Sequence, residues 1–228
     1  MKIILAIVMM ISLSSCIASL QPLVTYDSVV TDSRVVGNWA HNNEDLKIEP
    51  LPQSQFAKEI EKLSLNQKGK IQSLTGDETK DSIFYSKMYM VSFERKGASY
   101  FMAAGLIKIG NNLFMNLFPA AMYDTKVKED LSNPYSLNYD YQGGFTMAKV
   151  EMNNAQQITL KFIDGSFVKQ QILAGRMRLK HEKDELFDTF MITASTNELR
   201  QFIEKYANDE RVFSKDATIV LTRKPGHL

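Results

Sequence analysis

Cys16 is the only cysteine among the 228 residues of the chain. A single cysteine cannot form a disulfide within the chain, so its presence needs an explanation of its own. Only a thiol offers the nucleophile that thioether formation needs. The residues around Cys16 must therefore show what this thiol does.

The other residues that could do chemistry form no catalytic or metal-binding pattern. His41, His181 and His227 lack the spacing of a zinc site, and no further cysteine can complete one. The acidic run at 182–185 could flank a glycosidic bond, but solvated turn residues between two strands explain it more simply. Ser195 has no evident base partner and is explained as a helix cap, and the sequence contains no nucleophile elbow or phosphate loop. We therefore predict that the protein is not an enzyme and holds no metal or cofactor.

Residues 1–15 have the pattern of a secretory signal peptide. Lys2 supplies the single positive charge, and the run from Ile3 to Leu13 is apolar except at Ser12. This run is too short to cross a bilayer core about 30 Å thick as a helix. We therefore predict that residues 1–15 direct export and are then removed.

The tetrapeptide Leu13-Ser14-Ser15-Cys16 resembles the lipobox of bacterial lipoproteins, in which a branched apolar residue and two small residues precede the cysteine. The resemblance implies cleavage before Cys16, lipidation of its thiol, and acylation of the new amino terminus with a chain such as palmitate. An anchor with two or more acyl chains holds a protein stably on a membrane. Three alternatives stay open: an ordinary signal peptide cut after Ala18 or Ser19, an uncleaved anchor, and a buried first strand.

The residue after Cys16 is not Asp. By resemblance to sorted lipoproteins, this favours a lipid-anchored protein of the bacterial outer membrane that faces the periplasm. Residues 16–32 have no strong periodicity and are predicted to be a lipidated tether, and residues 33–228 are predicted to form a single domain.

The charge balance argues against a nucleic-acid-binding protein. Lys2 is the only charged residue among the first fifteen, so the 27 basic and 26 acidic residues of the whole chain leave an even balance beyond it. Nucleic-acid binding needs a basic stripe for phosphate contacts. After residue 16, no apolar run approaches membrane-spanning length.

The pattern beyond the signal segment predicts mainly β structure. We predict strands at 34–40, 45–49, 83–95, 99–109, 113–118, 145–152, 157–163, 177–181, 187–194 and 217–224. We predict short helices at 54–63 and after Ser195, an exposed loop at 66–81, and a long connection at 119–144. Residues 166–173 fit either a helix or a strand, and we favour the helix because alternation fails at 169–171.

The tripeptide Gly37-Asn38-Trp39 resembles the Gly-x-Trp signature of the lipocalin and calycin barrels. In that family the tryptophan closes one end of the barrel, and an arginine on the last strand lies across its indole. The matching residue is Arg223, on the strand face that Ile219 and Leu221 share. The resemblance implies an antiparallel lipocalin-like β-barrel with two or three short helices. The family's other loop signature is missing, and the long connection at 119–144 also departs from the family pattern.

The resemblance implies that the anchored domain binds a small apolar or amphipathic ligand in the barrel mouth. Flexible methionine side chains in the predicted strands suit an adaptable pocket, although core filling explains them equally: Met88, Met90, Met102, Met115, Met147 and Met152. The alternative is a non-catalytic envelope protein with a packed barrel, whose loops bind a protein or polysaccharide. Tyr135, Tyr139 and Tyr141 could form such a contact patch.

Overall fold

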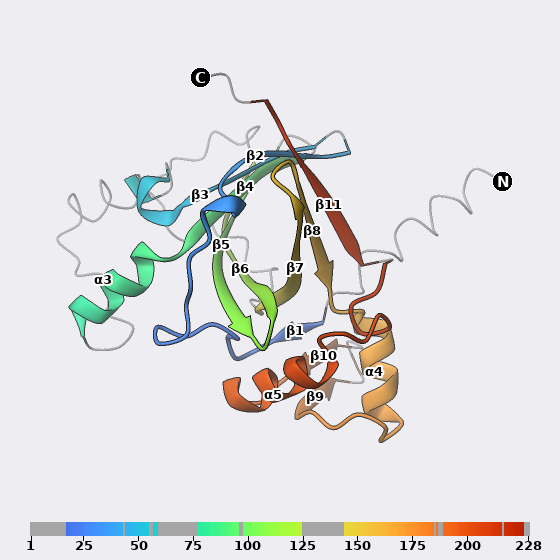
Figure 1. The fold of residues 1–228 in the computed structure, drawn as a ribbon. Helices are drawn as coiled ribbons and strands as arrows, with labels where there is room; N and C mark the ends of the chain where they lie inside the picture. Colours follow the sequence, from blue (N-terminus) through green and yellow to red (C-terminus); the bar gives the residue numbers. More distant parts are fainter. Residues whose placement is uncertain are drawn as a thin grey trace.

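The computed structural model describes residues 17–42, 44–54, 57–58, 77–95, 98–124, 144–184, 186, 189–215 and 217–225. Within these ranges, eight strands form a closed barrel, and three α-helices and a small second sheet lie around it (Figure 1). This arrangement confirms the predicted mainly β fold with a lipocalin-like antiparallel barrel.

The barrel follows the order of the chain, with the last strand returning to the first. Its strands are β2 (Gly37–His41), β3 (Glu44–Pro50), β4 (Tyr89–Arg95), β5 (Ala98–Ile109), β6 (Asn112–Asp124), β7 (Thr146–Asn154), β8 (Gln157–Phe162) and β11 (Thr218–Arg223). All neighbours are antiparallel, and β11 pairs with both β2 and β8, which closes the ring. Closure removes the exposed edges that an open sheet of this size would present.

Side chains on the barrel strands alternate between the interior and the outside, as the period of two in a strand requires. Trp39, Leu106, Met115 and Leu221 share the interior cluster and are at most 1% exposed. A water-sized void beside these side chains would leave them accessible area. Around these described side chains, the interior of the barrel is therefore filled.

A second layer packs against the outer face of β5, β6 and β7, and we call it the lateral layer (Figure 1). It contains α4 (Gly165–Leu173), α5 (Thr196–Tyr206) and a three-stranded sheet in the order β1 (Ala18–Ser19), β10 (Thr189–Ile192), β9 (His181–Asp184). Ile107 and Phe114 from the barrel share one buried cluster with Ile172 of α4 and Phe202 of α5. The described residues thus form two apolar cores, one inside the barrel and one beside it.

The two helices of the lateral layer begin at side chains that cap them. Asp164 accepts a 2.9 Å hydrogen bond from Phe167 N at the start of α4, which confirms the helix favoured at 166–173. Ser195 and Glu198 form the predicted capping box of α5, with Ser195 N donating to Glu198 Oε2 at 2.9 Å. Each cap satisfies backbone N–H groups that have no partner within the helix.

The prediction of a strand at 83–95 is wrong in its first part, because residues Glu78–Ser86 form helix α3. Asp77 caps this helix by accepting hydrogen bonds from Thr79 N and Lys80 N. Ile83, which looked like the start of a strand, lies on the helix and is 52% exposed. The strand itself begins at Tyr89.

The acidic run at 182–185 also differs from its prediction as a turn. His181–Asp184 form β9, which among the described strands pairs only with β10 and is the edge of its sheet. Charged side chains are common on edge strands, where they discourage pairing with other chains. The sequence did not predict this strand because its residues show no alternation of apolar and polar side chains.

Residues 17–32, which the sequence suggests as a tether, pack onto the fold from Ile17 onward. Ile17 is 7% exposed, and Leu23, Val24 and Val29 are at most 5% exposed. The chain then enters the short 3₁₀ helix η1 (Ser33–Val35) before β2; a second one, η2 (Leu51–Gln53), follows β3. The described part of the chain is therefore packed onto the fold from its first residue, Ile17.

Candidate functional site

The structure brings Gly37, Trp39 and Arg223 together where the first and last barrel strands meet. The guanidinium carbon of Arg223 lies 4.2 Å from the centre of the Trp39 ring, and Trp39 Nε1 donates a 2.9 Å hydrogen bond to Val35 O. A Cβ atom on Gly37 would lie 2.3 Å from Arg223 Nη1. Because Gly37 also has a φ of 153°, glycine suits this position in both backbone conformation and space.

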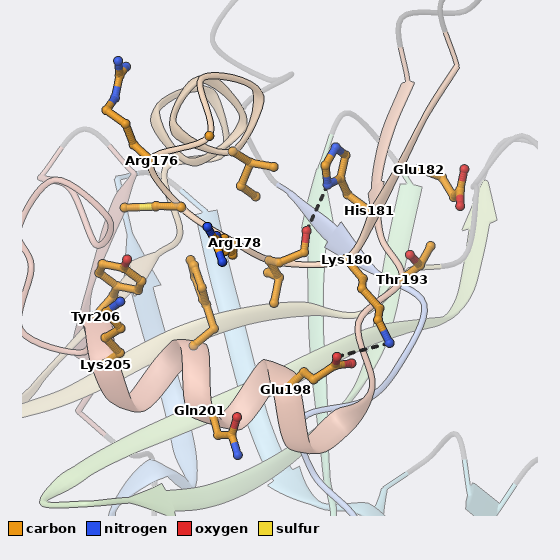
Figure 2. Close-up of a pocket in the computed structure, with 15 residues that line it drawn as sticks. Arg176, Arg178, Lys180, His181, Glu182, Thr193, Glu198, Gln201, Lys205 and Tyr206 are labelled. Carbon is orange, nitrogen blue, oxygen red and sulfur yellow. Dashed lines mark hydrogen bonds and ion pairs between the residues drawn. The ribbon is translucent and has the colours of Figure 1, made fainter.

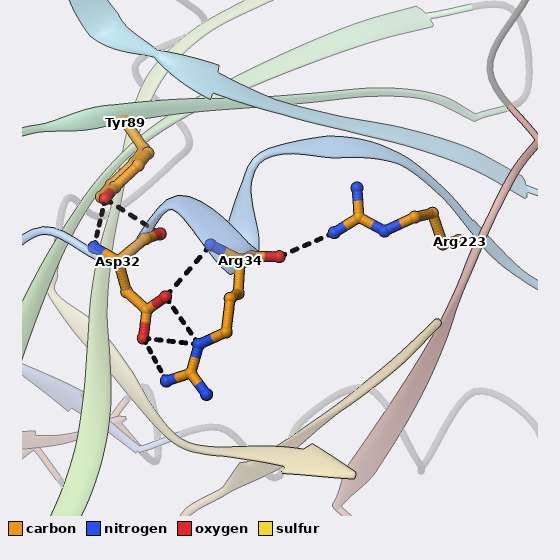
Figure 3. A network of polar contacts seen from close by, with 4 residues as sticks. All are labelled: Asp32, Arg34, Tyr89 and Arg223. Carbon is orange, nitrogen blue, oxygen red and sulfur yellow. Dashed lines mark hydrogen bonds and ion pairs between the residues drawn. The ribbon is translucent and has the colours of Figure 1, made fainter. Parts of the chain in front are cut away.

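Figure 3 shows how Arg223 ties η1 to this end of the barrel. Arg223 donates to Arg34 O at 2.8 Å and to Val36 O at 2.9 Å. Arg34 pairs with Asp32 at 2.5 Å, and Tyr89 Oη accepts a 2.8 Å bond from Asp32 N. The bond from Arg34 holds the pKa of Asp32 below its ordinary value, and burial raises the pKa of Tyr89. The polar groups at this end are thus engaged in closing the barrel.

A different part of the molecule offers room for a ligand. A groove of about 1020 Å³ lies on the lateral layer between residues 175–182 and α5 (Figure 2). This volume is typical of sites for small molecules. Its lining residues are Ile172, Gly175, Arg176, Met177, Arg178, Leu179, Lys180, His181, Glu182, Thr193, Glu198, Gln201, Phe202, Lys205 and Tyr206.

The floor of the groove is apolar and belongs to the core of the lateral layer. Ile172 and Met177 are 6% exposed and Phe202 is 5% exposed, while Leu179 and Tyr206 pack partly buried against the same cluster. A ligand in the groove would therefore rest on side chains that are already held in place by packing.

The rim of the groove is mainly cationic. Arg176, Arg178, Lys180 and Lys205 face two acidic residues, Glu182 and Glu198. This excess of positive charge attracts anions.

Three of these cations are held by neighbours. Arg176 Nε donates to Gln171 Oε1 at 2.7 Å, Lys180 pairs with Glu198 at 3.2 Å, and Lys205 lies 5.2 Å from the centre of the Tyr206 ring. The Arg178 guanidinium, by contrast, makes no hydrogen bond or ion pair with any residue in the described ranges, and Figure 2 shows it in the middle of the lining residues. Arg178 can therefore offer its planar fork of donors to an anionic group.

Glu198 is fixed as an anion at the rim. The backbone N–H of Ser195 and then its hydroxyl, which donate at 2.9 and 2.8 Å, together with Lys180 lower the pKa of Glu198 from 4.5 to about 2. Glu198 therefore stays ionised at neutral pH and keeps Lys180 on the α5 side of the groove.

His181 lines the groove without an acidic partner in the described part of the chain. Its ring stacks on Phe190 with centroids 4.9 Å apart, and Nδ1 donates to Leu179 O at 2.9 Å. No group of three or more His, Cys, Asp or Glu side chains suited to a metal ion occurs among the described residues.

Several predicted residues lie outside the described ranges, so their predictions stay untested: Cys16, Tyr135, Tyr139, Tyr141, His227 and most of the helix predicted at 54–63. The groove itself was missed, although the sequence carries a signal for it. Arg176-Met177-Arg178-Leu179-Lys180 alternates cations with apolar residues, and the structure buries Met177 while exposing Arg176 and Arg178.

Comparisons of the chain with protein-family models, with curated proteins and with solved structures found no match. Among the described helices, none has both the length and the apolar composition needed to cross a membrane.

Proposed function

We propose that this protein is a lipid-anchored lipoprotein of the bacterial cell envelope that binds a small amphipathic anion in the groove of its lateral layer. The observation that carries this proposal is the combination in one groove of an apolar floor, a cationic rim and the Arg178 guanidinium, which no residue in the described ranges engages. The protein acts by binding and not by catalysis.

The groove replaces the barrel mouth as the proposed binding site because the middle of the barrel is filled. Burial of about 200 Å² of a ligand's apolar surface on the groove floor would contribute about 5 kcal/mol. The cations on the rim would orient the charged head, and a charge-assisted hydrogen bond from Arg178 would add about 1.5–3 kcal/mol. Apolar burial thus supplies most of the affinity, and charge selects the ligand.

The anchor rests on residues 1–16: a signal segment that ends in Leu13-Ser14-Ser15-Cys16. Lipidation of Cys16 would hold the domain on the outer membrane, facing the periplasm. Changing Cys16 to Ala should abolish incorporation of labelled palmitate and release the protein from the membrane. Tight retention without label would contradict the anchor.

The filled barrel also favours a second function, in which a packed barrel binds a protein or polysaccharide through its loops. The residues proposed for that contact, Tyr135, Tyr139 and Tyr141, lie outside the described ranges. The groove gives the first function the stronger support, because it joins an apolar floor to a cationic rim.

The groove is tested by calorimetric titration with dodecanoate, which has an apolar chain and one carboxylate. The two cores and every described strand lie within residues 17–223, so the chain from Ile17 retains the whole described fold. We expect the variant Arg178→Gln to bind dodecanoate about tenfold more weakly than the parent chain. Lys47→Gln, which removes a cation from the outer face of β3, is the matched control.

Dodecanol, which has the same chain and no charge, should also bind about tenfold more weakly than dodecanoate. Equal affinity of the Arg178 and Lys47 variants, or of the acid and the alcohol, would contradict the proposal. Solvent extraction of the protein purified from cells, followed by mass spectrometry, would then identify the natural ligand.

A further inference from the structure

The chain beside the proposed lipid attachment is fixed to the folded domain. Ser19 N donates to Phe145 O at 2.9 Å, Phe145 N donates to Ser19 O at 2.8 Å, and Leu20 N donates to Ile192 O at 2.9 Å. A Cβ atom on Gly144 would lie 2.6 Å from Ala18 Cβ, so this contact is close-packed. One peptide unit, about 3.8 Å between Cα atoms, joins Ile17 to Cys16.

The residues that follow are also held. Asn116 Oδ1 accepts a 2.8 Å bond from Leu23 N, and Arg200 Nε donates to Leu23 O at 3.0 Å. Val30 N then donates to Leu106 O at 2.9 Å. An anchor at Cys16 would therefore act on a rigid body and not on a flexible tether.

The groove lies on the same sheet as this anchored end. Ala18 is paired with Met191, and Met191 with Glu182, which lines the groove. Neighbouring strands are about 4.8 Å apart, so Ala18 and Glu182 are separated by about 10 Å. The headgroup region of a bilayer is itself about 5–7 Å deep on each side.

A second apolar feature lies at the same end of this sheet. β1 runs parallel to β10, so from Ala18 back to Ile17 the chain points toward Thr189, where β10 begins. The connection between β9 and β10 carries Leu186, which is 84% exposed. Covering a leucine this exposed with a membrane surface removes apolar area from water and so stabilises the contact.

Together these observations identify a source for the ligand. Resting on the anchor and groove of the proposed function, we propose that the groove takes up an anionic phospholipid from the leaflet that holds the acyl chains of Cys16. The rigid attachment at Ile17–Ser19 keeps the groove at the membrane surface, and Leu186 contacts that surface. Arg178 and its neighbouring cations bind the phosphate, and the groove floor covers the upper part of an acyl chain.

The first experiment measures the position of the lipidated full-length protein on vesicles of phosphatidylcholine and phosphatidylglycerol. Because Cys16 is the only cysteine and would be blocked by lipid, a Leu186→Cys variant takes up an environment-sensitive dye at one site. We expect spin labels near the lipid headgroups to quench this dye at least threefold more strongly than the same dye on an Ile83→Cys variant. Ile83 is 52% exposed on α3, which Figure 1 places far from α4.

The second experiment places the dye in the groove with a Gln201→Cys variant. Spin-labelled phosphatidylglycerol should quench it several-fold more strongly than spin-labelled phosphatidylcholine at equal concentration. We expect the added changes Arg178→Gln and Lys205→Gln to abolish this difference. The charge-matched changes Lys47→Gln and Lys215→Gln, both at exposed lysines outside the groove, should leave it unchanged.

The outcomes separate this inference from the proposed function. Dye uptake at Cys16, or failure of the chain to enter vesicles, would contradict the anchor. A vesicle-bound protein with an unquenched Leu186→Cys dye, or with equal quenching by both lipids in the groove, would overturn the inference and leave the anchor standing. If dodecanoate still bound the chain from Ile17 in that case, the ligand would come from solution.

Discussion

The barrel and the lateral layer use the same kinds of apolar side chain in different ways. In the barrel, strands surround the interior, and Trp39, Met115 and Leu221 belong to one buried cluster with almost no exposed area. In the lateral layer, α5 and residues 175–182 lie over a core that is left partly uncovered in the groove. A closed sheet buries the apolar side chains of its inner face against one another. Two elements that pack beside a sheet can instead leave a groove between them in which a ligand can bind.

The largest effect is expected from Trp39→Ala. Removing the indole would leave a cavity at the closed end of the barrel and lower the free energy of unfolding by about 3–5 kcal/mol. Because Trp39 is the only tryptophan, the variant has no tryptophan fluorescence to follow. Urea denaturation is therefore monitored by circular dichroism. Dodecanoate affinity of the folded variant should stay within about twofold; a parallel loss of binding would show that the barrel and groove are not separate.

The next effect concerns the space beside Arg223. Gly37→Ala would strain the backbone at its φ of 153° and also force the Arg223 guanidinium to move away from the new Cβ, so it should destabilise the fold by about 2–3 kcal/mol. Gly110→Ala is the control, because Gly110 has a φ of 57° but no atom within 4 Å of an added Cβ. Its cost should be only the backbone strain of about 1–2 kcal/mol. Equal thermal stability of the two variants would argue against a steric role of Arg223.

A comparable effect is expected where the N-terminal segment joins the barrel. Asn116 is 3% exposed, and its Oδ1 accepts from the N–H groups of Leu23 and Val24. Asn116→Ala would leave buried donors without a partner and cost about 1–3 kcal/mol. Hydrogen exchange at Leu23 and Val24 should accelerate, whereas Asn154→Ala at the exposed end of β7 should not affect it. Unchanged exchange would mean that other contacts hold this segment.

The smallest effect is the pH dependence of the groove rim. The folded state lowers the pKa of Glu198 from 4.5 to about 2, so its contribution is present above pH 4.5 and is lost as the pH falls toward 2. Because the side chain is exposed, solvent screening keeps the effect small. Melting temperatures between pH 5 and pH 2.5 should fall more for the parent chain than for Glu198→Gln. Parallel curves would show that the capping box does not depend on this charge.

Local patterns and the family resemblance made part of this structure predictable. The capping box at Ser195 and Glu198 spans four residues and can be read directly, and the contact of Trp39 with Arg223 follows from a known signature. The packing of residues 17–32 could not be read in this way, because Asn116 and Arg200 hold Leu23 from 93 and 177 residues away. The groove could not be predicted for the same reason, because Arg178 and Lys205 are far apart in the sequence and lie on one groove only in the folded chain.

The most direct test of the central claim is hydrogen exchange of the chain from Ile17 with and without saturating dodecanoate. If the lateral layer is the binding region, protection should rise at residues 175–182 and in α5, while β5, β6 and β7 exchange at unchanged rates. Protection confined to the barrel strands, with the groove unaffected, would contradict the account and return the ligand to the barrel.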